Sequence, residues 1–133
     1  DLFLEDTVEI IADPEQLRKV LNNIVSNAVK YMDKKEPKIQ FSLSDAGDFV
    51  EVMIKDNGKG IEKKDLPYIF ERFFRSDTAR NTGTGGSGIG LSIVKKIIED
   101  SGGRIWAESE IEEGTSIHFV LRKHFPELVD NPG

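Results

Sequence analysis

The sequence contains no cysteine, only two histidines, and no long apolar run. Without cysteine, neither a disulfide framework nor a thiolate metal site can form, and two histidines alone do not complete a zinc site. No apolar stretch approaches the ~18 residues that indicate a membrane span. The first residues do not show the pattern of a signal peptide either. These absences argue against a disulfide-rich scaffold, a zinc module or a membrane span within this stretch.

Positive charge is also scarce, since 18 lysines and arginines stand against 24 aspartates and glutamates, for a net charge of −6. Such a surface repels a polyanion, so we expect no nucleic-acid binding, and an anionic ligand must be held by local cations and backbone amides. A length of 133 residues with 38% hydrophobic content fits one domain, residues 1–133, with a core at about 8–122 and a polar tail at 123–133. The abrupt ends suggest a piece of a longer protein.

The clearest element is a helix that begins after Asp13, with Pro14 at its first position and Gln16 three residues after the cap. It runs to about Tyr31. Apolar residues recur along it at spacings of three and four, which predicts one buried face. The residues of this face are Leu17, Val20, Leu21, Ile24, Val25 and Ala28.

The remaining elements are mostly strands. "VEIIA" is a short strand candidate, "KIQFSLS" and "FVEVMIK" predict a hairpin, and "RIWAES" and "TSIHFVLR" predict two more strands. "KKDLPYIFERFF" reads as a short helical stretch interrupted by proline, and residues 75–87 as a long functional loop. A second helix begins near Gly88 and ends at Gly102-Gly103. Its buried residues are expected to be Leu91, Ile93, Val94, Ile97 and Ile98.

This order is too irregular for a doubly wound parallel sheet. We expect an α/β (α+β) two-layer sandwich: a mixed sheet of about five strands, helices on one face, and a mobile lid.

A polar group on the first helix asks for an explanation. Asn23, Asn27 and Lys30 fall close together, because spacings of four and seven residues return to nearly the same angle. Asparagine is a poor helix former, so two in register suggest a function. A solvated polar face explains them equally well, and the helix alone leaves both readings open.

A second candidate is "DNGKGI", residues 56–61. Asp-Asn-Gly after a strand is typical of a hairpin turn, but the charged, proline-broken sequence that follows is a poor returning strand. Paired glycines that let the backbone approach a ligand fit better. Asp56 is then placed to accept a hydrogen bond from a ligand amine.

The third candidate is "GTGGSGIGLSIVKK", residues 83–96. A P-loop needs Lys and Ser/Thr after its last glycine, whereas Leu91 and Ser92 follow Gly90. The G-x-G-x-x-G spacing of a dinucleotide fold is present, but no buried strand precedes it. The glycines therefore close a long loop and open a helix, whose first amides suit phosphates.

Together and in this order, the motifs resemble the ATP-binding catalytic domain of sensor histidine kinases, in the superfamily that includes gyrase, heat-shock chaperones and mismatch-repair ATPases. "NNIVSNAVKY" looks like the N box of that family, "DNGKGI" the G1 box, "YIFERFFR" the F box, "GGSGIGLSIVKKII" the G2 box and "EGTSIHF" the last glycine-containing box. The resemblance spans Val8 to Leu121, nearly the whole chain.

The resemblance implies a set of site residues. Asn27 would bind Mg²⁺ on the ATP phosphates with Asn23 beside it, and Lys30 and Arg75 would offset phosphate charge; these four are the catalytic candidates. Asp56 would accept from the adenine amino group. The remaining residues expected to contact ATP are Tyr31, Gly58, Gly60, Ile61, Ile69, Phe70, Gly86, Ser87, Gly88, Ile89, Gly90, Leu91 and Thr115.

One departure from the superfamily bears on the reaction. Its ATP hydrolases carry a glutamate base four residues before the Mg²⁺-binding asparagine, and here that position is Asn23, which cannot take a proton at neutral pH. Transfer of the γ-phosphoryl group to another nucleophile is therefore favoured over hydrolysis. Neither histidine has the family's acceptor pattern, and for His118 and His124 we expect structural or surface roles.

The expected function is thus phosphoryl transfer from Mg²⁺-ATP to a histidine on a separate helical dimerisation and phosphoacceptor domain of the same protein, which then serves a response regulator. A serine kinase of the anti-sigma type and a nucleotide sensor without catalysis remain alternatives. The resemblance also implies a cytoplasmic domain of a membrane-bound sensor, with no membrane contact of its own.

Overall fold

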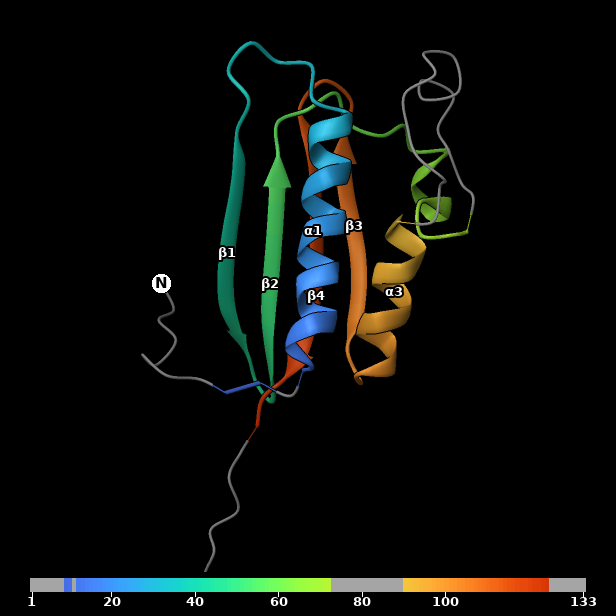
Figure 1. Ribbon diagram of the computed structural model, residues 1–133. Coiled ribbons are helices and arrows are strands. Elements are labelled where there is room, and N and C mark those ends of the chain that lie inside the picture. The colour runs from blue at the N-terminus through green and yellow to red at the C-terminus, as the bar shows by residue number, and fades with distance from the viewer. Residues whose placement is uncertain (1–8, 11, 73–89, 125–133) are drawn as a thin grey trace, which may run out of the picture.

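A computed structural model describes residues 9–10, 12–72 and 90–124 of the chain. A helix, α1 (Pro14–Lys30), precedes the hairpin of β1 (Ile39–Ala46) and β2 (Phe49–Asp56). A short 3₁₀ helix, η1 (Leu66–Tyr68), follows. The helix α3 (Gly90–Asp100) then leads into the hairpin of β3 (Arg104–Glu110) and β4 (Gly114–Arg122). Figure 1 shows the helices stacked on one face of the sheet, as an α+β sandwich.

The sheet of the described residues has four strands in the order β1-β2-β4-β3, and each neighbouring pair is antiparallel. We expected about five strands in a mixed sheet. The parallel pairing is absent here because each helix leads into a hairpin, and the second hairpin docks through β4 beside β2. Of the expected amino-terminal strand, the described residues show one antiparallel bridge, Ile10 to Lys123.

The first helix forms as its sequence predicts. The Asp13 side chain accepts a hydrogen bond from the Glu15 amide at 2.9 Å, and Pro14 occupies the first turn, where a missing amide proton costs nothing. Val20, Ile24 and Ala28 are buried on the inner face of the helix. Leu17 and Leu21 pack against the core from its edges.

The core lies between the two helices and the facing side of the sheet. Leu91, Val94 and Ile98 of α3 are buried in it. Ile93 was expected in the core as well, but it is 37% exposed, because buried residues of α3 recur at spacings of three and four and Ile93 falls between them. The core residues of the sheet are Ile54, Ile105, Ile117, Phe119 and Leu121.

The strand register determines which residues meet at one end of the sheet. Asp56, the last residue of β2, pairs with Ile39 on one side and with Thr115 on the other. The carboxyl end of β2 and the start of β4 therefore lie together, next to the end of α1. Within the described segments, no helix combines the length and apolar character needed to cross a bilayer.

Candidate nucleotide site

Asp56 is held in place by hydrogen bonds at this end of the sheet. Its Oδ1 atom accepts hydrogen bonds from the Gly58 amide at 2.8 Å and from the Thr115 amide at 3.3 Å. Burial raises the pKa of the Asp56 carboxyl, and these two hydrogen bonds and the positive charge of Lys34 oppose that shift. The carboxylate is thus fixed in position yet has no ion pair with any lysine, arginine or histidine of the described residues.

A small pocket opens beside Asp56. It brings together six of the predicted site residues: Asn27, Tyr31, Asp56, Gly60, Ile61 and Thr115. Its apolar floor comes from Ile24, Ala28, Ile54 and Ile117. Its volume is about 20 Å³, close to the space of one water molecule, so in this structure it is a small hollow beside the half-buried Asp56.

The two glycines of the segment after β2 are required by close contacts. A Cβ atom at Gly58 would come within 2.9 Å of the Tyr31 carbonyl oxygen. Gly60 has a φ of 80°, and a Cβ atom there would collide with the Glu110 carbonyl group. This segment is therefore pressed between the end of α1 and the β3–β4 hairpin, where no side chain fits.

Ser109 ties the same segment to the β3–β4 hairpin. Its Oγ atom accepts from the Ile61 amide at 2.8 Å, donates to the Gly114 carbonyl oxygen at 2.9 Å, and lies 2.8 Å from Thr115 Oγ1. One hydroxyl thus joins residues from the loop after β2 and from β4. Thr115 is only 8% exposed, so these contacts are sheltered from water.

The polar face of α1 points toward the start of α3. Asn23 donates from Nδ2 to the Lys19 carbonyl oxygen at 2.9 Å, which leaves its Oδ1 atom toward Gly90, 3.5 Å from where a Cβ would lie. Asn27, one turn on, lines the Asp56 pocket, whereas Lys30 in the last turn is exposed. The residues expected to hold phosphate and metal therefore extend from the pocket toward the amino end of α3.

The predicted apolar wall lies mostly in the core. Ile69 and Leu91 are buried members of the core cluster, and Phe70 packs against that cluster. Ile61 lines the pocket directly. The predictions for Arg75, Gly86, Ser87, Gly88 and Ile89 fall outside the described residues.

Three residues that shape the site were not predicted from the sequence. The Lys34 ammonium donates to the Gly58 carbonyl oxygen at 3.1 Å. Asn57 accepts from the Lys38 amide at 2.8 Å and donates to the Glu36 carbonyl oxygen at 3.1 Å. Ser109 is the third. Only Asn57 lay within a recognised motif; the other two act across long sequence separations that no local pattern reveals.

Neither histidine lies near Asp56. His118 is buried on the sheet face away from the helices, stacked on Trp106 with ring centroids 5.2 Å apart. Its nitrogens contact Glu51 at 2.9 Å and Glu108 at 3.0 Å. His124 is exposed at the opposite end of the sheet, where its amide donates to the Glu9 carbonyl oxygen at 2.7 Å. The structural and surface roles expected for them agree with these positions.

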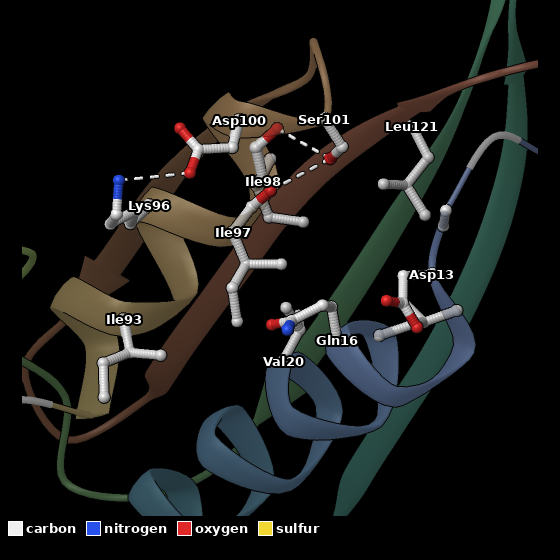
Figure 2. A pocket seen from close by; sticks show the side chains of 12 residues that line it. Asp13, Gln16, Val20, Ile93, Lys96, Ile97, Ile98, Asp100, Ser101 and Leu121 are labelled. Carbon is white, nitrogen blue, oxygen red and sulfur yellow. Dashed lines mark hydrogen bonds and ion pairs between the residues drawn. The ribbon is translucent and has the colours of Figure 1, made fainter.

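A larger cavity of about 450 Å³ lies between α1 and α3 and shares no lining residue with the Asp56 pocket (Figure 2). Several of its polar groups already have partners. Lys96 pairs with Asp100 at 3.1 Å, and the Ser101 hydroxyl donates to the carbonyl oxygens of Ile97 and Ile98. Its two acids, Asp13 and Asp100, are engaged by the Glu15 amide and by Lys96, and size alone does not make this cavity the nucleotide site.

The donor set fits a phosphate-supported magnesium ion better than a metal held by protein alone. The described residues contain no cluster of three or more histidine, aspartate or glutamate side chains suited to a metal. Mg²⁺ commonly takes one or two protein oxygens and completes its shell with water and substrate phosphates. The Asn27 side-chain amide at the pocket edge is compatible with such a role.

Comparisons with known proteins place this chain in a family. The family model described as "Histidine kinase-, DNA gyrase B-, and HSP90-like ATPase" matches residues 12–124. The sensor histidine kinase WalK of Bacillus subtilis (strain 168) is 39% identical over 91% of this chain, which spans only 19% of WalK. The mycobacterial sensor histidine kinase MprB superposes with a TM-score of 0.76 at 30% identity, covering 88% of this chain and 78% of that one. Full-length ShkA in complex with AMPPNP superposes with a TM-score of 0.71 at 28% identity. The superposition covers 86% of this chain and 23% of the ShkA chain.

Proposed function

This chain belongs to the histidine kinase-, DNA gyrase B- and HSP90-like ATPase family, and from that premise we propose that it is the ATP-binding catalytic domain of a sensor histidine kinase. The chain spans about a fifth of the length of the WalK relatives it matches. The activity of the whole protein is therefore part of this proposal.

The observation that carries the proposal is the state of Asp56. A half-buried carboxylate is costly, and its pKa is raised by burial, yet among the described residues the only groups that bind it directly are two amides on one of its oxygens. Its other oxygen accepts no hydrogen bond from the parts of the chain that the structure describes. The exocyclic amino group of adenine is a donor of the kind that this oxygen lacks. The complex of ShkA, a structural relative, with the ATP analogue AMPPNP supports the assignment of an adenine nucleotide.

The phosphates are proposed to lie along the polar face of α1, toward the start of α3. Asn27 would hold Mg²⁺ through its amide oxygen, with Asn23 beside it and Lys30 offsetting negative charge. When bound, Mg²⁺ would neutralise the negative charge that develops on the phosphates during transfer. Arg75 and the glycines 86, 88 and 90 are proposed to contribute cation and backbone amides, with Ser87 and Ile89 between them.

The proposed reaction moves the γ-phosphoryl group from ATP to an imidazole nitrogen. The lone pair of that nitrogen forms the nitrogen–phosphorus bond, and the bond between the γ-phosphorus and the bridging oxygen breaks, so that ADP leaves with the electron pair. The proton on the other ring nitrogen is released afterwards. Neutral imidazole is already a nucleophile near pH 7, so this domain has to position and neutralise the phosphates rather than activate the nucleophile.

Asn23 supports transfer over hydrolysis. A water molecule needs a base to become an effective nucleophile, and an amide does not accept a proton at neutral pH. The Asn23 side chain is also occupied, since Nδ2 is bound to the Lys19 carbonyl oxygen. We therefore expect slow turnover of ATP by this domain alone.

The partner in this proposal is a helical dimerisation and phosphoacceptor domain of the same protein, and a response regulator receives the phosphoryl group from it. A domain that uses ATP in this way works in the cytoplasm, so we propose that location for it. Neither His118 nor His124 serves as the acceptor, because one is locked between Glu51 and Glu108 and the other lies at the far end of the sheet.

Calorimetric titration of Mg²⁺-ATP tests the binding step. We expect saturable binding of ATP with modest affinity, because the entropy lost when the site becomes ordered opposes the favourable interactions with the nucleotide. Binding of ATP that is unchanged in Asp56→Asn would remove Asp56 from the adenine role. A chain that binds no adenine nucleotide would overturn the proposed function.

A further inference from the structure

The peptide bond between Gly58 and Lys59 is held at both of its polar groups by the loop that follows α1. Its carbonyl oxygen, that of Gly58, accepts a hydrogen bond from the Lys34 ammonium at 3.1 Å. Its amide, that of Lys59, donates to the Tyr31 carbonyl oxygen at 3.3 Å. Because a peptide unit is planar and rigid, it cannot turn without losing both hydrogen bonds.

The amide of Gly58 itself points the other way, toward Asp56. It donates to the Asp56 Oδ1 atom at 2.8 Å. Glycine has no Cβ atom and adopts more backbone conformations than other residues, so Gly58 alone does not set the direction of this amide. The hydrogen bond from Lys34 to the Gly58 carbonyl oxygen restrains the same residue from its other side. Lys34 therefore helps to keep the Gly58 amide directed at the carboxylate.

Lys34 also acts on Asp56 through its charge. Burial raises the pKa of the Asp56 carboxyl, and the positive charge of Lys34 works in the opposite direction. The Lys34 side chain is only 31% exposed, so water screens this charge in part. An ionised carboxylate accepts hydrogen bonds at both oxygens, whereas a protonated one carries a proton on one of them. Lys34 thus favours the form of Asp56 that accepts from a ligand.

The elements packed against Asp56 bring it few other titratable groups. The strand neighbours that pair with Asp56 are Ile39 of β1 and Thr115 of β4, and neither side chain titrates. At the end of α1, the Tyr31 phenol is the only other titratable group among the described residues that line the pocket. Lys34 is therefore the cation to change when the control of Asp56 is tested.

We propose that Lys34 is a positioning residue of the nucleotide site, which fixes the Gly58–Lys59 peptide and so holds Asp56 as a carboxylate acceptor for the amino group of the base. Lys34 acts through Gly58 and through its charge rather than by contact with the nucleotide. The proposal rests on the proposed function, because it names what maintains the acceptor of that site. The competing explanation is that Lys34 only forms an ion pair with Asp33, whose Oδ1 atom lies 3.1 Å from the Lys34 ammonium.

Two measurements test the proposal. Carbon-13 NMR titration of the Asp56 carboxyl in the nucleotide-free chain follows the acid directly, and calorimetric titration with Mg²⁺-ATP at pH 7 follows its effect on the ligand. In Lys34→Met we expect a higher pKa for Asp56, because the positive charge is lost. We also expect an affinity for ATP that is lower by about fivefold, which corresponds to about one hydrogen bond. Lys34→Arg keeps the charge and the donor and is expected to retain both wild-type values.

Two further variants are matched controls. Lys35→Met removes the same charge from an exposed neighbouring position, and Asp33→Asn removes the ion pair of Lys34 while leaving its hydrogen bond to Gly58. Neither is expected to raise the pKa of Asp56 or to weaken ATP binding. A merely structural role in the loop would leave the pKa of Asp56 unchanged in Lys34→Met.

If either the pKa of Asp56 or the affinity for ATP is unchanged in Lys34→Met, the proposal is wrong and Lys34 is only the partner of Asp33. Changes of the same size in Lys35→Met would also overturn it, because they would reflect net charge rather than position. Wild type that binds no adenine nucleotide would instead overturn the proposed function, whatever the titration of Asp56 shows.

Discussion

The β1–β2 hairpin carries an aspartate near each end, and the fold treats the two carboxyls in opposite ways. Asp45, beside the turn, is exposed and bonded to the Lys123 ammonium at 2.7 Å, which lowers its pKa, with help from the Gly47 amide. Asp56, at the other end, has its pKa raised by burial, and within the described segments only two amides bind it directly. One acid has its charge partner within the fold, and the other is held without one.

This difference indicates that Asp45 has a structural role and that Asp56 is available to bind a ligand. The Asp45 carboxylate has its charge partner in Lys123 and needs no further one. A partly buried carboxylate costs free energy unless a donor meets it, and such groups gather at binding sites. We infer that the Asp56 end is built for a ligand and that the Asp45 end only closes the hairpin.

The largest effect is expected from the glycines at the two ends. Gly60 and Gly47 have similar φ values, 80° and 75°, but a Cβ at Gly60 meets the Glu110 carbonyl group, and one at Gly47 meets nothing within 4 Å. Gly60→Ala is expected to lower the free energy of unfolding by about 3 kcal/mol, and Gly47→Ala by only about 1 kcal/mol. Urea denaturation of both variants measures this. Equal losses of unfolding free energy in the two variants would mean that the close contacts around Gly60 do not contribute to stability.

Removing the charge of Asp56 and that of Asp45 in separate variants tests the difference between the two ends of the hairpin. Asp56→Asn is expected to weaken ATP binding by about 2 kcal/mol, roughly thirtyfold, because an amide places a donor near the adenine amino group and a charged hydrogen bond is lost. Asp45→Asn serves as the control and is expected to bind ATP with wild-type affinity. Titration calorimetry at pH 7 distinguishes them, and matching affinities in all three proteins would contradict the functional reading of Asp56.

A smaller change is expected on the polar face of α1. Asn27→Ala is expected to remove the Mg²⁺-dependent part of ATP affinity, about tenfold, while the folded state persists, since the side chain lies at the pocket edge. Asn22→Ala, an exposed position on the same helix, is the matched control. Affinities are compared with Mg²⁺ and with EDTA. If the ATP affinity of Asn27→Ala still depends on Mg²⁺ as in wild type, another residue must be the metal ligand.

The smallest expected effects are on how stability depends on pH. The signs expected for Asp56 and Asp45 are opposite. A raised pKa means that the folded state favours protonated Asp56, so the stability of wild type relative to Asp56→Asn is greatest below pH 3.8 and falls as the pH rises through the raised pKa. A lowered pKa means the reverse for Asp45: wild type gains over Asp45→Asn above pH 3.8 and loses this gain as the pH falls. Thermal melts of the unliganded proteins from pH 3 to pH 7 measure both. Slopes of the same sign would contradict the contrast.

Local patterns predicted much of the fold. The Asp13 cap, the buried face of α1 and both hairpins follow from capping and periodicity, which depend on neighbouring residues. The strand order does not, because it depends on how the second hairpin docks, and the antiparallel four-stranded arrangement differs from the mixed sheet that we expected.

The candidate site shows the same division. Asp56 and Gly60 stand in a recognisable motif, so their proximity to Asn27 was expected and the pocket brings them together. The role of Ser109 was not predicted from the sequence. Its hydrogen bond to the Ile61 amide spans 48 residues, and no local sequence pattern around a serine in a strand indicates such a contact. Predictions for residues 75 and 86–89 remain predictions, since they fall outside the described residues.

The most direct measurement of the central claim is transfer of label from γ-labelled ATP to a separately added helical domain of the parent protein that bears the acceptor histidine. The account predicts label on that histidine, little release of inorganic phosphate by this domain alone, and loss of transfer in Asp56→Asn but not in Asp45→Asn. Rapid hydrolysis of ATP by this domain, with no label reaching the histidine, would contradict it.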